Sequence, residues 1–259
     1  MNATLKFCKF DIISKLMFRH KGSGRTHSYN LKLASILSGV AGTVNITSVL
    51  SVSTLTTNIT GHFAFLSEEI FERNFNAAFI VLSYIFSFLL GAFTSGLMTE
   101  IASRKKHYLS YVIPISLEIS ILLAAGLSQI FFPKILQEYQ MLLSNALLFA
   151  MGLQNALVTK ISDSVVRTTH LTGLFTDLGI NLSQLFFIKG NDNDIKVKRS
   201  IFLKLAIITC FFLGGLIGGF LYIYFNLKTL LFPAALLLFA LWYDRILFRY
   251  YSLKRKLRH

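Results

Sequence analysis

Long apolar blocks, separated by short polar stretches, dominate the pattern along the chain. A helix needs about 20 apolar residues to cross a hydrocarbon core of about 30 Å. Blocks of this kind predict six transmembrane helices, and the shortest of them ends in an aromatic pair typical of membrane interfaces, Trp242 and Tyr243. The predicted helices cover residues 33–51, 77–99, 108–127, 139–159, 200–225 and 229–244. The fold class predicted is therefore an all-α integral membrane protein.

Two further stretches, residues 54–66 and 165–188, are partly apolar but too polar or too short for ordinary transmembrane helices. They are expected either to lie on the membrane interface or to enter the protein as broken or re-entrant segments. Non-helical backbone at membrane depth requires protein or a water-filled cavity to satisfy its amide groups. If these stretches are re-entrant, they therefore mark places where polar groups are needed inside the membrane.

The composition agrees with a membrane protein, because 54% of the residues are hydrophobic and only 15% are charged. Such a composition excludes a soluble globular enzyme and a disordered chain. The net charge of +14 is concentrated in two basic tails, residues 1–32 and 245–259. Tails of this kind beside an apolar body indicate anionic lipid as their partner and not nucleic acid.

The distribution of Lys and Arg also predicts the orientation of the chain. With six crossings, both tails lie on the same side, together with the basic stretches around residues 104–106 and 160–199. The loops on the opposite side carry only Arg73, Lys134 and Lys228. The positive-inside rule then places both termini in the cytoplasm. Neither a disulfide between the two cysteines nor a cleavable signal peptide is expected.

The chain contains an internal repeat. Four landmarks recur in the same order in both halves, and in the longest pair six of eleven positions are identical. The pairs are TTNITGHFAFL (56–66) with TTHLTGLFTDL (168–178), GTVN (42–45) with GLQN (152–155), FLLGAFTSG (88–96) with FFLGGLIGG (211–219), and Pro114 with Pro233.

Each repeat unit contains three predicted transmembrane helices, residues 33–127 in the first and 128–244 in the second. Because three is odd, the two units enter the membrane from opposite sides. Inverted repeats of this type are found in many secondary transporters, whose sites form near the midplane between the repeats. The alternative is a duplicated helical bundle that transports nothing.

At these landmarks the sequence resembles the YoaK-type family, uncharacterised bacterial membrane proteins of about six helices. The resemblance rests on Thr60–Gly61, on FLLGA (88–92), on AMGLQNA (150–156) and on the TxxTG block within 169–177. It covers residues 33–243 and leaves both tails outside. The resemblance implies an integral protein of the bacterial inner membrane, without a settled substrate or reaction.

Glu118 lies at the centre of the third predicted helix, where a carboxylate is costly unless it faces the protein interior. One interpretation is a proton or cation site. The other is a protonated glutamic acid that hydrogen-bonds a neighbouring helix. The repeat aligns Glu118 with Leu237, so this carboxylate breaks the internal symmetry.

Three amides, Asn45, Gln154 and Asn155, lie on the first and fourth predicted helices, which the repeat relates to one another. Amides in transmembrane helices often only join helices through hydrogen bonds. Here they also precede the two Thr-Gly segments in both copies, which indicates a polar site near the midplane.

The Thr-Gly segments suit either of two roles. Glycine permits a break in a helix, and threonine hydroxyls can satisfy freed backbone groups or coordinate a ligand. The alternative is simple capping of the short helices that follow. The sequence leaves open whether the acid just beyond the second segment is embedded or at the cytoplasmic surface. These candidate residues are Thr57, Thr60, Gly61, Thr169, Thr172, Gly173 and Asp177.

The leading functional hypothesis is a small secondary transporter or permease for an unidentified small solute. The alternative is a membrane scaffold or sensor that does not transport. No catalytic motif, metal-ligand spacing or nucleotide motif is present, so neither an enzyme nor a cofactor is expected. The GGLIGG run is expected to be a small-residue face for close helix contact. The oligomeric state cannot be read from this pattern.

Overall fold

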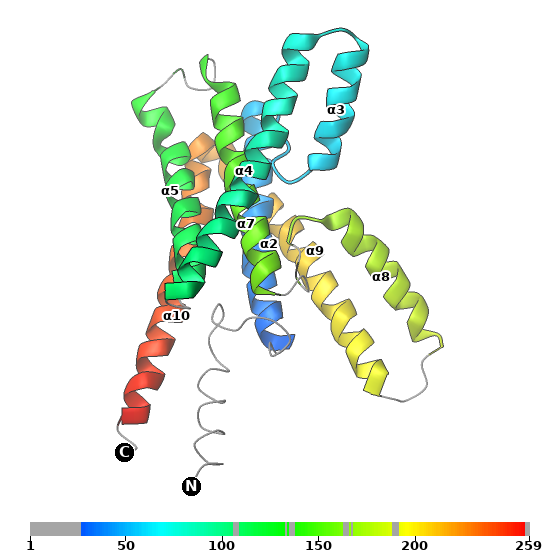
Figure 1. The fold of residues 1–259 in the computed structure, drawn as a ribbon, viewed down its shortest axis with the longest axis vertical. Coiled ribbons are helices and arrows are strands. Elements are labelled where there is room, and N and C mark those ends of the chain that lie inside the picture. The colour runs from blue at the N-terminus through cyan, green and yellow to red at the C-terminus, as the bar shows by residue number, and fades with distance from the viewer. Residues whose placement is uncertain are drawn as a thin grey trace.

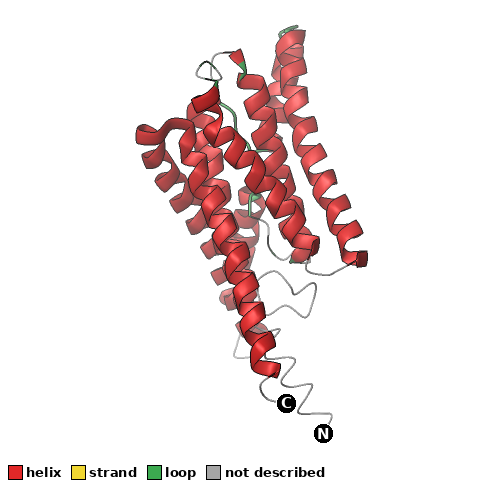
Figure 2. Ribbon diagram, turned by 90° about the vertical axis from the view of Figure 1, so that its left-hand side faces the viewer, coloured by secondary structure: helices red, strands yellow, loops and turns green. Residues whose placement is uncertain are grey.

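A computed structural model of the chain describes residues 27–105, 109–132, 134, 138–162, 166, 168–187 and 192–256. This part of the chain is helical and contains no strand, and its helices lie side by side in an elongated bundle (Figures 1 and 2). The helices are α2 (His27–Val52), α3 (Ile59–Phe71), α4 (Phe75–Lys105), α5 (Leu109–Phe131), α7 (Gln140–Ile161), α8 (Leu171–Leu185), α9 (Asp192–Phe225), the 3₁₀ helix η2 (Asn226–Leu230) and α10 (Leu231–Lys256).

Five stretches of the described residues are long and apolar enough to cross a membrane. The last of them contains two helices, α9 and α10, which meet at η2. The chain turns there at Asn226, whose φ is 49°. These stretches make the chain a helical membrane protein. They are Asn30–Val52, Phe75–Arg104, Ser110–Phe131, Gln140–Ile161 and Asp194–Arg245.

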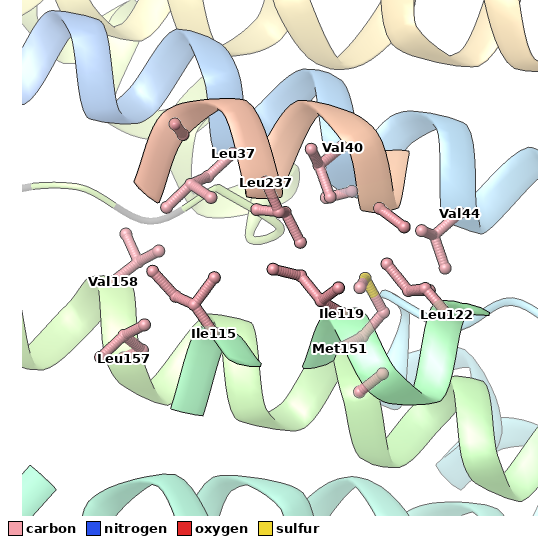
Figure 3. Packing of buried hydrophobic residues seen from close by; sticks show 14 of the residues in the cluster. Leu37, Val40, Val44, Ile115, Ile119, Leu122, Met151, Leu157, Val158 and Leu237 are labelled. Carbon is pink, nitrogen blue, oxygen red and sulfur yellow. The ribbon is translucent and has the colours of Figure 1, made fainter. Parts of the chain in front are cut away.

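The core lies among α2, α5, α7 and α10, where aliphatic side chains meet with almost no exposed surface (Figure 3). On α5 the buried positions recur every three or four residues, which is the spacing of one helix face. Many large apolar side chains on α4 and α9 instead point outward, including Phe79, Phe86, Phe212 and Phe220. An apolar outer face of this kind is what contact with lipid requires.

The helices pair across the two halves of the chain, α2 with α9 and α4 with α7, and glycines permit the close approach. A Cβ placed on Gly42 would lie 2.0 Å from the Phe211 carbonyl oxygen of α9. A Cβ on Gly152 would lie 2.2 Å from the Phe88 oxygen of α4. Only glycine fits at such contacts, which are typical of small-residue packing in membranes.

The same positions recur in both pairs. Gly91 of α4 approaches α7 as closely as Gly214 of α9 approaches α2, with Cβ distances of 2.1 and 2.2 Å to carbonyl oxygens. In addition, the succession of buried, half-buried and exposed residues in 32–50 is identical to that in 142–160. Two stretches with different side chains therefore occupy the same packing environment.

Candidate functional site

The stretches predicted to be broken or re-entrant form α3 and α8, two short helices outside the apolar stretches long enough to cross a membrane. Figure 1 shows both beginning near mid-height on the same side of the bundle. From there α3 runs towards one end of the molecule and α8 towards the other (Figure 1). The N-termini of the two helices thus lie near the middle of the bundle, and the helices run from there toward opposite ends.

Asn45 ties the loop before α3 back onto α2. Its Oδ1 accepts hydrogen bonds from the main-chain N–H of Thr56 at 3.0 Å and from the Thr57 hydroxyl at 3.1 Å. Asn45 lies seven residues before the end of α2 at Val52, which is about 10 Å along the helix axis. The loop therefore folds back along α2 by about two turns before α3 begins.

Asn155 makes the matching contact in the second half. Its Oδ1 accepts a hydrogen bond from the Thr169 hydroxyl at 3.0 Å. Asn155 lies six residues before the end of α7 at Ile161, so the segment before α8 also returns along its preceding helix, by about 9 Å. We call these two sets of Asn–Thr contacts, one before α3 and one before α8, the asparagine brackets. They fix the positions of the segments from which α3 and α8 begin.

The Thr-Gly steps themselves lie in the first turns of α3 and α8, after the break. Asn58 caps α3 by accepting a hydrogen bond from the Gly61 N–H at 3.1 Å. A Cβ on Gly61 would lie 2.7 Å from the Asn58 side chain, and one on Gly173 would lie 2.6 Å from the His170 ring. A side chain at either position would therefore crowd the residue that precedes the helix. The hydrogen bond from Gly61 to Asn58 is a capping contact, whereas His170 makes no side-chain cap at the start of α8.

The structure thus brings some of the candidate residues together and separates others. Thr60 and Thr172 are exposed in the first turns of their helices, and Asp177 is exposed further along α8. None of these three side chains has a recorded contact with either asparagine bracket among the described residues. The brackets consist of Asn45 with Thr56 and Thr57, and of Asn155 with Thr169.

Glu118 and Gln154 lie apart from the brackets, inside the core. Glu118 is 1% exposed and Gln154 is 0% exposed. Neither the two carboxyl oxygens of Glu118 nor the amide O and N of Gln154 has a hydrogen-bond partner among the described residues. Their helices, α5 and α7, pack against each other. Unsatisfied buried polar groups of this kind are rare and need an explanation.

Core residues that neighbour Glu118 and Gln154 along their helices lie close together (Figure 3). Glu118 falls between Ile115 and Ile119 on α5, and Gln154 falls between Met151 and Val158 on α7. The figure shows Ile115 across from Val158 and Ile119 beside Met151 (Figure 3). The position aligned with Glu118, Leu237, is fully buried in the same cluster.

Sequence reasoning missed two buried polar contacts. The Thr43 hydroxyl lies 2.9 Å from the Gly214 carbonyl oxygen, joining α2 to α9 beside the glycines. The Tyr111 hydroxyl donates to the Asp244 carboxylate at 2.9 Å, joining α5 to α10. Asp244 follows the core residue Leu237 by seven residues, so helical spacing alone places it on the buried face.

We expect Asn45→Leu to lower the free energy of unfolding by about 2 kcal/mol, and Asn155→Leu by about 1 kcal/mol. The first change removes the acceptor for the buried N–H of Thr56 as well as for Thr57, whereas the second removes the acceptor for one described donor. Thermal unfolding of the detergent-solubilised protein measures both. Asn76→Leu, at an exposed position of α4, is the control and should change stability by less than about 0.5 kcal/mol. An equal loss at Asn76 would show that the brackets contribute nothing specific.

Comparison with known proteins identifies a family and no activity. No curated protein and no solved structure matches the chain. One family model matches residues 33–243, a range that overlaps all five apolar stretches and contains both brackets, and its description is "Protein of unknown function (DUF1275)". This range is most of the chain and equals the range of the YoaK-type resemblance. The chain therefore belongs to the DUF1275 family, a family of proteins of unknown function.

Proposed function

We propose that the chain is a small secondary transporter or permease for a small solute in the bacterial inner membrane. In this proposal the chain crosses the membrane six times, in two inverted three-helix repeats with both termini in the cytoplasm. The proposal assigns the chain no catalytic reaction, metal or cofactor. It also takes the YoaK-type proteins and the family matched here to be the same kind of protein.

The observation that carries the proposal is the pair of short helices that begin at mid-height and run to opposite ends (Figure 1). Secondary transporters with inverted repeats use discontinuous helices in this way, with helix N-termini and freed backbone groups near the midplane. Here each start is held by an asparagine bracket. Irregular backbone at this depth is tolerated only where protein or a water-filled cavity satisfies it.

The packing of the helices supports the inverted repeat. A two-fold axis in the membrane plane requires any contact between the two units to recur with the units exchanged, so a contact of α2 with α9 must be matched by one of α7 with α4. The pairs α2 with α9 and α4 with α7 have this arrangement, with matching glycine contacts in each. The identical burial succession of 32–50 and 142–160 supports the same relation.

The ends of the helices support the orientation. The first described residues of α2 and the last residues of α10 lie at the same end of the molecule (Figure 1). The basic tails continue from that end, which suits the anionic cytoplasmic leaflet. The interior pair Glu118 and Gln154 then supplies the polar groups with which a transporter of this kind would bind a proton or a cation.

A second candidate function is a membrane scaffold or sensor without transport. The observation that favours it is the lining of a cavity beside α2, α8 and α9, which is almost wholly apolar. This cavity does not include either Thr-Gly step. If the protein transports a polar solute, water must be able to reach the asparagine brackets. If the protein is a scaffold, the brackets can stay inaccessible to water.

Access of water to the brackets therefore distinguishes the two functions. Single cysteines at Thr57 and Thr169, in a chain whose two native cysteines are changed to serine, are treated with a membrane-impermeant maleimide from either side. We expect both positions to react from both sides, because alternating access opens the midplane to each side in turn. Intact cells report the periplasmic side, and inverted membrane vesicles report the cytoplasmic side.

Asn74 and Arg104, at the two ends of α4, provide the matched controls for this experiment. Asn74→Cys should react only from the periplasm and Arg104→Cys only from the cytoplasm. The reverse pattern would show that the orientation is wrong. Transport would be excluded, and the scaffold favoured, by either of two results obtained with both controls correct. In the first, neither Thr57→Cys nor Thr169→Cys reacts from either side; in the second, each of them reacts from one side only.

A further inference from the structure

A cavity of about 620 Å³ lies on the side of the bundle between α2, α8 and α9. Its volume is within the range of about 300–1,000 Å³ that is typical of small-molecule sites. Leu171 and Phe175 of α8 line one part of it, and the remaining wall belongs to α2 and α9. Among the described residues that line it, Asn45 is the one with a polar side chain.

The shape of the cavity suits an extended hydrocarbon chain. Its lining follows α9 from Ile208 to Ile223, which corresponds to about 22 Å along the helix. A single leaflet contributes about half of the 30 Å hydrocarbon core. The cavity is therefore long enough to hold a lipid-like chain that lies along the helix.

Two glycines of the GGLIGG run, Gly215 and Gly219, line this cavity. A Cβ on Gly215 or Gly219 would find its nearest neighbour at 3.9 or 3.8 Å, which is ordinary contact. A Cβ on Gly214 or Gly218 would instead collide with α2. The GGLIGG run thus has one face for helix contact and one face that forms the cavity wall.

Asn45 supplies the only polar feature of this wall. Its Oδ1 already accepts hydrogen bonds from the loop before α3. Its Nδ2 has no recorded partner in the described part of the chain. Asn45 is half-buried, so its amide can donate a hydrogen bond to a ligand in the cavity that carries an acceptor.

We propose that this cavity binds a single-chain, lipid-like molecule, a long hydrocarbon chain that carries a hydrogen-bond-accepting oxygen. The chain lies along Gly215 and Gly219, and the oxygen accepts from Asn45 Nδ2. Such a ligand enters sideways from the lipid, since the wall of the cavity is formed by outward-facing residues of α9 such as Phe212 and Phe220. The inference holds whether or not the protein transports a solute.

The test uses the full-length protein in membrane vesicles and palmitic acid that carries a photoreactive diazirine in its chain. Labelled peptides are identified by mass spectrometry. We expect saturable labelling of α8 and α9 peptides, which excess unmodified palmitic acid removes. Gly219→Leu should reduce this labelling about tenfold, because it displaces several methylene groups from the wall.

Gly96→Leu is the matched control, because Gly96 is the aligned position on α4 and a Cβ there meets nothing within 4 Å. It should leave the labelling of α8 and α9 unchanged. If Gly219→Leu fails to fold, Leu216→Trp fills the same cavity from its edge. Labelling that does not saturate, or that is equal in the wild type and the filled variant, would overturn the proposal. A diazirine-bearing hydrocarbon without oxygen that labels as well as the acid would overturn the role of Asn45.

Discussion

Gly42→Ala and Gly152→Ala are each expected to lower the free energy of unfolding by about 3 kcal/mol or more. The added methyl group would lie 2.0 Å from the Phe211 oxygen in the first case and 2.2 Å from the Phe88 oxygen in the second. Both distances are below 3.0 Å, a limit that real Cβ atoms essentially never cross. Both obstacles are backbone atoms, so a whole helix must move to make room.

Gly96→Ala is expected not to lower the free energy of unfolding, because a Cβ at Gly96 meets nothing within 4 Å. This change should be neutral or stabilising by about 0.5–1 kcal/mol, since alanine is the better helix former. Thermal unfolding in detergent, followed by size-exclusion chromatography, compares the three variants. If the two helix pairs are equivalent, Gly42→Ala and Gly152→Ala should lower the free energy of unfolding by equal amounts. A small loss at either glycine, similar to that at Gly96, would contradict the close contact and the equivalence of the two pairs.

Glu118→Leu is expected to stabilise the protein by about 1–3 kcal/mol while removing its function. Neither carboxyl oxygen of Glu118 has a hydrogen-bond partner among the described residues, so the wild type bears the desolvation cost of this group. Leucine already occupies the aligned position, Leu237, in the same core. If Glu118→Leu is more stable than the wild type, a function best explains why the carboxyl group is present at this buried position.

The functional half of this prediction uses the cysteine reporter at Thr57. Glu118→Gln keeps the size of the side chain but removes its titratable proton, and Glu118→Leu removes the polar group altogether. We expect either change to abolish the reaction of Thr57→Cys from one of the two sides, while the controls at Asn74 and Arg104 still react. The opposite result has two parts: Glu118→Leu destabilises the protein, and Glu118→Gln changes neither folding nor the reaction of Thr57→Cys from the two sides. In that case the carboxyl group is structural, and it has no role in binding a proton or a cation for transport.

Several features of this fold were predictable because they follow from local pattern. Apolar length alone predicts helices at the places where α2, α4, α5 and α7 occur, with differences of a few residues at their ends. The turn at Asn226 separates the last two predicted helices, as the polar residues there indicate. The repeated motifs align Asn45 with Asn155, and each of these asparagines accepts a hydrogen bond from a threonine of the segment that follows it.

The roles of individual glycines and threonines were not predictable in the same way. The sequence pairs Thr60–Gly61 with Thr172–Gly173, but it does not show that the break precedes them or that Asn58 and His170 need the space beside each glycine. Likewise the GGLIGG run reads as one small-residue face, although within this run a Cβ would collide with α2 only at Gly214 and Gly218. These distinctions depend on which neighbour a side chain meets, and that neighbour lies far away along the chain.

The sequence by itself therefore determined that the chain is a helical membrane protein, where its helices lie, and which positions of its two halves correspond. These properties follow from the hydrophobic length of each block and from repeated local motifs, neither of which needs a partner helix. Only the tertiary structure decided that α2 pairs with α9 and α4 with α7, and that a cavity opens beside Asn45. It also decided that Glu118 and Gln154 lie in the core without hydrogen-bond partners among the described residues. The physical reason is that apolar helices in a membrane gain little from the hydrophobic effect on meeting each other, so the fit of glycine surfaces selects their partners.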